Sequence, residues 1–187
     1  MLHLLLQTKK FIPNEFHDSV YEIDFEALYK DGKRIILSDL DNTLISYDEF
    51  VPSTKNLEFF AMLEEIGFEI ILLSNNIPSR ISRYVENLDV IGFANARKPL
   101  NIGMKKAFKA TSKPYRKDEL IVIGDQLMTD VWGANRFGSY SILVNPIKKK
   151  TEKWYTKMNR RIEVKMIEKI KSKYNDTFVE LGLGQRR

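Results

Sequence analysis

The sequence predicts an α/β fold of three layers, in which a central, mostly parallel sheet lies between helices. The spacing of apolar runs and helical patterns leads to this prediction. Apolar runs of about five to seven residues alternate with helical patterns of about ten residues. This alternation indicates parallel strands joined by right-handed crossovers. The length of 187 residues suits one domain, and no internal repeat or low-complexity linker divides the chain.

The expected elements follow one another between residues 24 and 146. The first helix has Asp24 as a plausible N-cap, and the second is closed by Gly67. In the second helix, Leu57, Phe60 and Leu63 recur at helical spacing and predict its core face. Strands are expected within 33–39, 68–76, 90–99, 119–125 and 140–146, and helices within 24–32, 51–67, 78–88, 101–111 and 127–138.

The composition excludes several classes of protein. The chain has no cysteine, which excludes disulfides, thiolate metal sites and cysteine nucleophiles and fits a reducing, cytoplasmic location. No apolar run approaches the roughly 20 residues that a membrane-spanning helix needs. The opening stretch "MLHLLL" has neither a basic region nor a small-residue cleavage site, so we do not expect it to be a signal peptide.

Charge is unevenly distributed along the chain. The formal net charge is +5, but residues 146–187 contain 13 Lys/Arg against 5 Asp/Glu, whereas the rest contains 17 against 20. We therefore expect 146–187 to form a basic, helical C-terminal extension of a single domain that spans 1–187. Any acidic partner should be sought at this extension.

Polar clusters follow four of the predicted strands. They are "DLDNT", "SNN", "ARKP" and "GDQLMTD", and they begin at residues 39, 74, 96 and 124. Ligands of open α/β sheets bind outside the carboxyl ends of the strands, where these clusters would meet.

Each polar residue alone has an ordinary explanation. Either Asp39 or Asp41 could be a turn residue, Ser74 could cap a helix, Lys98 could be a solvated surface lysine, and Asp130 could be a helix N-terminal charge. The ordered set is harder to explain in this way. Two Asp residues that stand two apart at a strand end point their side chains to the same side. Their carboxylates then repel each other unless a cation or a shared proton intervenes.

Phosphoryl transfer to a carboxylate needs such a set. The carboxylate attacks phosphorus, a Mg²⁺ ion reduces the repulsion between the two anions, and a second acid moves the protons. A lysine and small polar donors hold the remaining phosphate oxygens.

The four clusters resemble the motifs of the haloacid dehalogenase (HAD) superfamily of phosphatases. "DLDNT" is similar to the first motif, DxDx[TV], and "GDQLMTD" to the acidic fourth motif. Ser74 and Lys98 match the second and third motifs. From about Phe11 to Pro146 the chain resembles the YqeG-like phosphatases of HAD subclass IIIA, which are related to phosphatidylglycerophosphate phosphatases. Ser38 departs from the aromatic residue that this family usually has before the first acid.

The resemblance implies a Rossmann-like HAD fold and three catalytic residues. Asp39 would be the nucleophile and a Mg²⁺ ligand. Asp41 would be the general acid and base, with its backbone carbonyl on the metal. Lys98 would neutralise phosphate and position Asp39.

It also implies supporting roles. Thr43 would orient Asp41 and, with Ser74, Asn75 and Lys98, belong to the phosphate-binding set. Asp125 would be a direct metal ligand. Asp130 would lie behind the site and orient Lys98 or a metal-bound water.

The gaps between the motifs are too short for a cap domain. About thirty residues separate "DLDNT" from "SNN", and about twenty separate Ser74 from Lys98. We therefore expect an open site, which suits a large or membrane-embedded substrate or requires a neighbouring subunit of a homo-oligomer as its lid.

The basic extension has two main interpretations. Tyr155, Met158, Ile162, Met166 and Ile170 fall near one helical face. This helix could dock on the protein's own sheet, or it could rest on an anionic bilayer and make the protein peripheral to the membrane. Nucleic acid is a less favoured partner, although Trp154 and Tyr155 lie among lysines.

The function we expect is Mg²⁺-dependent hydrolysis of a phosphomonoester through an aspartyl phosphate. The resemblance points to phosphatidylglycerophosphate or a similar substrate, and thus to phospholipid metabolism. Two alternatives remain: a phosphatase acting on nucleic-acid or protein phosphate, and a largely non-catalytic binding or assembly factor.

Overall fold

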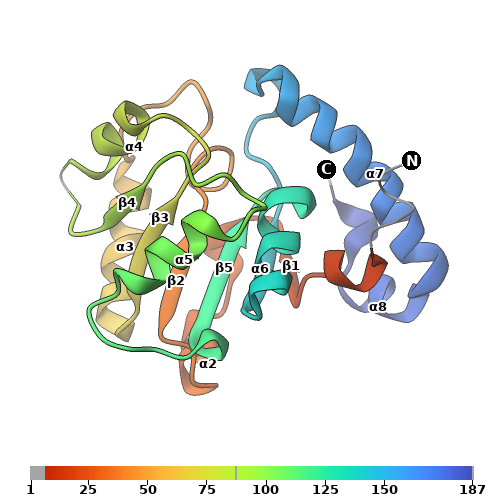
Figure 1. Cartoon of the computed structure of the whole chain (residues 1–187), viewed down its shortest axis with the longest axis horizontal. Coiled ribbons are helices and arrows are strands. Elements are labelled where there is room, and N and C mark those ends of the chain that lie inside the picture. The colour runs from red at the N-terminus through yellow and green to blue at the C-terminus, as the bar shows by residue number, and fades with distance from the viewer. Residues whose placement is uncertain (1–6, 87, 187) are drawn as a thin grey trace.

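A sheet of six parallel strands forms the centre of the fold in the computed structural model, which describes residues 7–86 and 88–186 (Figure 1). The strand order is β1-β6-β5-β2-β3-β4, and every neighbouring pair is parallel. The strands are β1 (Glu15–His17), β2 (Ile35–Ser38), β3 (Glu69–Leu73), β4 (Ile91–Phe93), β5 (Leu120–Gly124) and β6 (Tyr140–Val144).

The described residues also form seven α-helices. These are α2 (Phe25–Lys30), α3 (Thr54–Ile66), α4 (Pro78–Val85), α5 (Ile102–Lys109), α6 (Trp132–Phe137), α7 (Trp154–Lys173) and α8 (Asn175–Glu180). Short 3-10 segments are η1 (Thr8–Phe11), η2 (Val20–Glu22), η3 (Lys117–Glu119), η5 (Lys149–Thr151) and η6 (Leu183–Gln185). The segment η4 (Leu127–Val131) is a π-helix that runs directly into α6.

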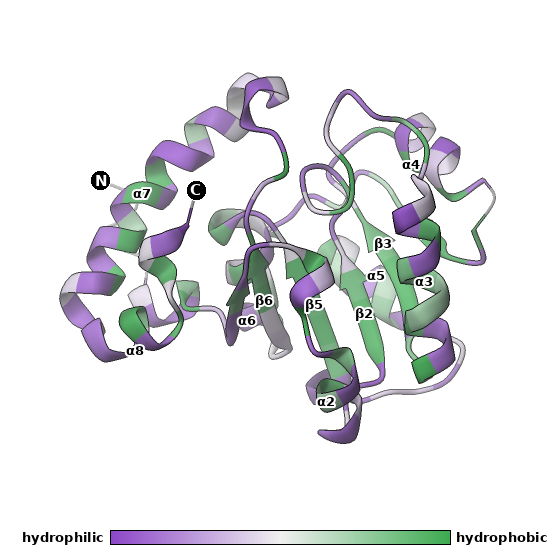
Figure 2. Cartoon of the chain, turned by 180° about the vertical axis from the view of Figure 1, so that it is seen from behind, coloured by the Kyte–Doolittle hydropathy of each residue, from purple (hydrophilic) through white to green (hydrophobic). Residues whose placement is uncertain are grey.

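Helices cover both faces of the sheet. On one face, Ile36 and Leu72 pack in a core with residues of α2, α3 and α4. On the other face, Ile35 and Leu73 pack with residues of α5 and α6. Because successive side chains of a strand point to opposite faces, both faces of a parallel sheet are apolar. Figure 2 shows the strands coloured as hydrophobic. The predicted three-layer α/β fold is confirmed.

The C-terminal helix docks on the protein itself. Met166 and Ile170 of α7 are fully buried, and they pack in a third core with Phe11 of η1 and Leu127 of η4. The outer face of α7 is rich in charged residues, although Trp154 and Val164 are also exposed, and Figure 2 shows purple along much of this helix. Met158, expected on the buried face, is 49% exposed. The side chain of Tyr155 lies outside the described residues.

Two details of the predicted elements differ from the structure. The strand β1 was not predicted, because three half-buried residues at a sheet edge carry almost no periodic signal. Leu57 is 42% exposed, and the core face of α3 is formed instead by Phe59, Phe60 and Leu63. The predicted closure of α3 by Gly67 is confirmed, since Gly67 has φ 105°.

Cap modules are not found in the two segments where they would be inserted. Between β2 and α3 the chain forms turns with one isolated bridge, Asp41 to Ile45. Between β3 and β4 the described residues contain α4 and no other helix or strand. Among the described residues, no helix combines the length and apolar character required to cross a bilayer. The stretch 1–6, on which the signal-peptide prediction rests, is not among them.

Candidate active site

The predicted site residues lie at the carboxyl ends of four neighbouring strands. Asp39 directly follows β2, Ser74 follows β3 and Asp125 follows β5. Lys98 lies in the loop after β4. Because β5, β2, β3 and β4 are adjacent and parallel, their carboxyl ends meet at one edge of the sheet, near α4 (Figure 1).

A small cavity of about 50 Å³ lies at this edge. It is lined by Asp39, Asp41, Tyr47, Ser74, Asn75, Asn76, Lys98, Gln126, Thr129, Thr156 and Asn159. Five of the predicted site residues therefore meet in it, whereas Thr43, Asp125 and Asp130 lie behind its walls. The cavity is polar, and its size suits a phosphate group rather than a whole metabolite.

Lys98 links two of the buried acids. Its Nζ lies 2.5 Å from Asp39 Oδ1 and 2.7 Å from Asp130 Oδ1. Burial lowers the pKa of Lys98, but Asp130 and Asp39 outweigh that effect, and the pKa lies above its ordinary value. The lysine is therefore a cation, fixed between two carboxylates. This is the position expected of a residue that neutralises phosphate and holds Asp39.

Asp39 is held in a strongly anionic environment. Burial raises its pKa well above the ordinary value, Lys98 opposes this, and the carboxylates of Asp130, Asp125 and Asp41 raise the pKa further. A further cation near Asp39 would thus be needed to keep it fully ionised.

Asp130 is held by residues at the start of η4. Its Oδ2 accepts hydrogen bonds from the Gln126 backbone N–H at 3.1 Å and from Thr129 Oγ1 at 3.2 Å. A Cβ atom at Gly124 would lie 2.2 Å from Asp130 Cγ, so only glycine lets the end of β5 approach this acid. The predicted link between Asp130 and Lys98 is present.

Asp41 is held by three side chains. Its Oδ2 accepts hydrogen bonds from Ser74 Oγ at 3.3 Å and from Asn76 Nδ2 at 3.1 Å. Its Oδ1 accepts one from Arg80 Nε at 3.0 Å. Arg80 also donates to the carbonyls of Ser46 and Glu49, and so ties Asp41 to the loop that follows the first motif.

Thr43 contacts a different acid from the one expected. Its hydroxyl lies 3.4 Å from Asp39 Oδ2. The carboxylate of Asp41 instead accepts hydrogen bonds from Arg80 and Asn76. The physical reason is the turn at Asn42, whose φ of 67° brings Thr43 back toward the end of β2. The prediction that Thr43 orients Asp41 is therefore corrected to a contact with Asp39.

Asn75 uses its side chain to hold the Lys98 backbone. The Lys98 N–H donates to Asn75 Oδ1 at 2.7 Å, and Asn75 Nδ2 donates to the Lys98 carbonyl at 3.2 Å. Asn75 therefore positions the lysine loop. Its predicted contact with phosphate stays a prediction.

The C-terminal helix forms one wall of the site. Thr156 and Asn159 of α7 line the cavity, and Thr156 Oγ1 lies 3.3 Å from the Tyr47 hydroxyl. Glu152 accepts a hydrogen bond from Asn42 Nδ2 at 3.2 Å. The expectation of an open site is thus modified, because the extension closes one side of it.

Arg160 of α7 reaches the fourth motif. It forms an ion pair with Asp125 Oδ2 and lies 2.9 Å from Glu152 Oε1. Burial raises the pKa of Asp125 to about 6, while Arg160 opposes this shift. The other oxygen, Asp125 Oδ1, is buried and has no hydrogen-bond partner among the described residues.

This unpartnered oxygen fits a metal ligand. A buried carboxylate oxygen without a partner is costly unless a cation or water satisfies it, and hard oxygen donors suit Mg²⁺. Among the described residues, no cluster of three or more acidic or histidine side chains is gathered closely enough to hold a metal. The predicted set, which combines the carboxylates of Asp39 and Asp125 with the backbone carbonyl of Asp41, stays a prediction.

Three residues that hold the predicted acids were missed from sequence, as were five that line the cavity: Tyr47, Gln126, Thr129, Thr156 and Asn159. Arg80 and Asn76 contact Asp41, and Arg160 contacts Asp125. Asn76 follows Ser74 and Asn75 in the cluster "SNN", and this position could have identified it as a site residue. Nothing in the spacing distinguishes either arginine from the solvated basic residues around it.

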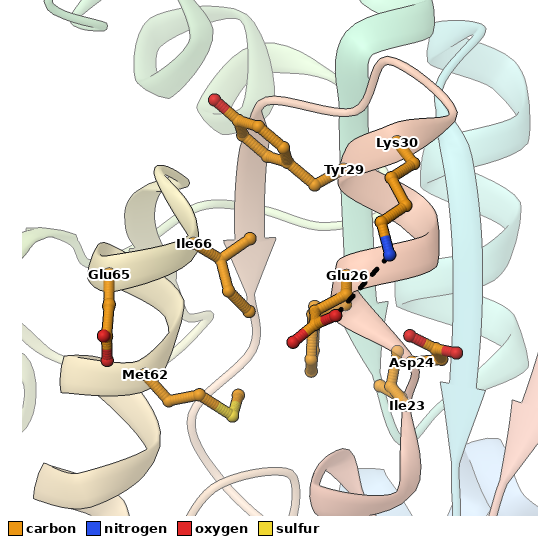
Figure 3. A pocket seen from close by; sticks show the side chains of 9 residues that line it. Ile23, Asp24, Glu26, Tyr29, Lys30, Met62, Glu65 and Ile66 are labelled. Carbon is orange, nitrogen blue, oxygen red and sulfur yellow. Dashed lines mark ion pairs between the residues drawn. The ribbon is translucent and has the colours of Figure 1, made fainter.

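A larger hollow lies elsewhere and lacks the features of an active site. It has a volume of about 610 Å³ and is lined by α2 and the last turns of α3. Figure 3 shows Met62 and Ile66 on one side and the ion pair of Glu26 with Lys30 on the other. That pair is exposed, and no predicted site residue is present. Size alone therefore does not identify the site.

Comparison with known proteins decides the family. Residues 1–148 match the model of a family described as mitochondrial PGP phosphatase. The chain belongs to the PGP phosphatase family. The chain is also 33% identical, over 165 residues, to a protein described as "Probable phosphatase YqeG" of Bacillus subtilis (strain 168), covering 88% of this chain and 94% of that protein. The predicted resemblance to YqeG-like phosphatases is confirmed, and the function is that of a phosphatase.

A solved structure supports the fold of this PGP phosphatase family member. The crystal structure of an uncharacterized protein from Listeria monocytogenes serotype 4b aligns with a TM-score of 0.51 and 20% identity, covering 64% of this chain and 85% of that one. At this identity the likeness concerns the fold alone.

Proposed function

We propose that this phosphatase hydrolyses a phosphomonoester through an aspartyl phosphate on Asp39, and that Mg²⁺ is its cofactor. The observation that supports this most is the position of Lys98, whose ammonium joins Asp39 and Asp130 beside a cavity of phosphate size. A carboxylate nucleophile, a fixed cation and several small polar donors are what the reaction needs.

The proposed reaction has two steps. In the first, Asp39 attacks phosphorus, and the bond from phosphorus to the leaving oxygen breaks as Asp41 gives that oxygen a proton. In the second, Asp41 takes a proton from water, the water attacks phosphorus, and Asp39 leaves as a carboxylate. Arg80, Ser74 and Asn76 hold the Asp41 side chain during both steps.

The phosphate oxygens are held by the protein. Lys98 neutralises charge on the phosphate, and Ser74 lines the same cavity. When bound, Mg²⁺ would reduce the repulsion between the two anions, and Asp39, Asp125 and the Asp41 carbonyl would hold it. The buried, unpartnered Asp125 Oδ1 supports this assignment.

The proposed substrate is phosphatidylglycerophosphate or a similar phosphorylated molecule. The family description supports the lipid. The small cavity also supports it, since only the phosphate would enter and the remainder would extend outside.

We also propose that the exposed face of α7 contacts an anionic membrane. Its buried side packs on η1 and η4, so only the outer face is available. On that helix Trp154 is 75% exposed and Val164 57% exposed, among lysines. Apolar and basic side chains together suit the lipid interface.

Removal of the metal is expected to stop the reaction. We expect a chelator to abolish hydrolysis of a generic aryl phosphate and added Mg²⁺ to restore it. Because Asp125 is a proposed ligand, Mg²⁺ should raise the melting temperature of the parent more than that of Asp125→Asn, as scanning calorimetry would detect. Full activity in chelator, or an equal shift in both proteins, would contradict the assignment.

A further inference from the structure

A second hollow adjoins the catalytic cavity and is not used by the reaction described above. It has a volume of about 420 Å³, and Tyr47 and Asn76 line both spaces. The catalytic cavity is large enough only for the phosphate. A leaving group bonded to that phosphate must therefore lie in a neighbouring space, and this groove shares two lining residues with the cavity.

The groove has a clear charge preference. Its lining contains Arg80, Arg83 and Lys153 and no carboxylate. Arg80 is already paired with Asp41. Arg83 is exposed, and within the described part of the chain it forms no ion pair; its guanidinium lies 5.0 Å from the centre of the Phe50 ring. Its charge is thus available to a ligand.

Lys153 lines the groove beside Asn76, which lines both spaces. Its Nζ donates a hydrogen bond to Asn76 Oδ1 at 3.1 Å, and Asn76 in turn contacts Asp41. A cation at this position would face the part of the leaving group nearest the reacting phosphate. The groove also carries apolar surface, since Phe50 is 47% and Ile77 59% exposed.

We propose that this groove is a leaving-group subsite that recognises a second anionic phosphate on the substrate, through Arg83 and Lys153. The inference rests on the proposed function, because it assumes that a phosphomonoester occupies the cavity. It assigns selectivity to two residues outside the four motifs. Substrates whose leaving group carries a phosphodiester should be preferred over those whose leaving group is neutral.

Kinetics with two soluble substrates test the selectivity. We expect the parent to have a higher kcat/KM for glycerophosphoglycerophosphate than for glycerol 3-phosphate. The double variant Arg83→Ala/Lys153→Ala should lose about tenfold or more of this preference, mainly through KM. The control Arg116→Ala changes an exposed arginine directly before η3 and should keep the preference. An unchanged preference in the double variant would overturn the proposal.

Two further experiments distinguish an effect on the subsite from an effect on the reaction and from an effect on membrane binding. Binding of glycerophosphoglycerol, which has the phosphodiester but no scissile phosphate, should be about tenfold or more weaker in the double variant by calorimetry. This binding experiment still tests the proposal if the protein hydrolyses neither substrate. No binding by the parent, or equal binding by the parent and the double variant, would overturn the proposal. If micellar phosphatidylglycerophosphate alone shows the loss, the residues act on the lipid surface, and the subsite proposal fails.

Discussion

Replacement of Asp39 by asparagine is expected to abolish phosphatase activity. The amide is a poor nucleophile, so the first chemical step should slow by at least about a thousandfold, or about 4 kcal/mol of barrier. The fold should persist. Burial and the neighbouring carboxylates oppose the charged form of Asp39, so the neutral variant should be at least as stable as the parent.

The measurement is the turnover of an aryl phosphate together with thermal unfolding. Asp118→Asn is the matched control, because it makes the same chemical change at an exposed residue of η3. We expect the control to retain full activity. Full activity in Asp39→Asn would reject Asp39 as the nucleophile, and a collapse of stability would reject the account of its environment.

Replacement of Lys98 by methionine is expected to reduce both activity and stability. The ammonium is buried between Asp39 and Asp130, and its loss leaves two buried carboxylates without their shared cation. The free energy of unfolding should fall by roughly 3–5 kcal/mol. Turnover should fall by roughly a hundred- to a thousandfold, because a donor to the phosphate is lost as well.

Two comparisons make this prediction specific. Lys105→Met, at an exposed position of α5, should behave like the parent. The double variant Lys98→Met/Asp130→Asn should regain part of the stability, since one of the two carboxylates is neutralised, but none of the activity. If Lys98→Met and the parent have the same midpoint of denaturant unfolding, the buried ion pairs do not contribute the stability that we assign to them.

The motif residues were predictable because parallel strands bring distant parts of the chain to one edge. Asp39 and Lys98 lie far apart in sequence, yet strand order alone places their loops together. The same reasoning located Ser74 and Asp130. Strand and helix patterns are local, and the arrangement of neighbouring strands follows from few rules.

The arginines of the site were not predictable for the opposite reason. Arg160 lies in a basic helix where most residues are solvated, and only the packing of α7 on η1 and η4 turns it toward Asp125. Arg80 likewise lies on a helix rich in polar residues. A long side chain can reach many partners, so its contact depends on the tertiary arrangement. The contact of Thr43 depended on one turn angle, at Asn42.

Detection of the phosphorylated intermediate tests the central claim most directly. Asp41→Asn should slow the second step, so that a phosphoryl group stays on the enzyme after mixing with an aryl phosphate and Mg²⁺. Mass spectrometry of acid-quenched protein should then find one added phosphoryl group on Asp39, and the double variant Asp39→Asn/Asp41→Asn should carry none. A phosphoryl group on another residue, or hydrolysis by the parent with no phosphoenzyme in either protein, would contradict the account.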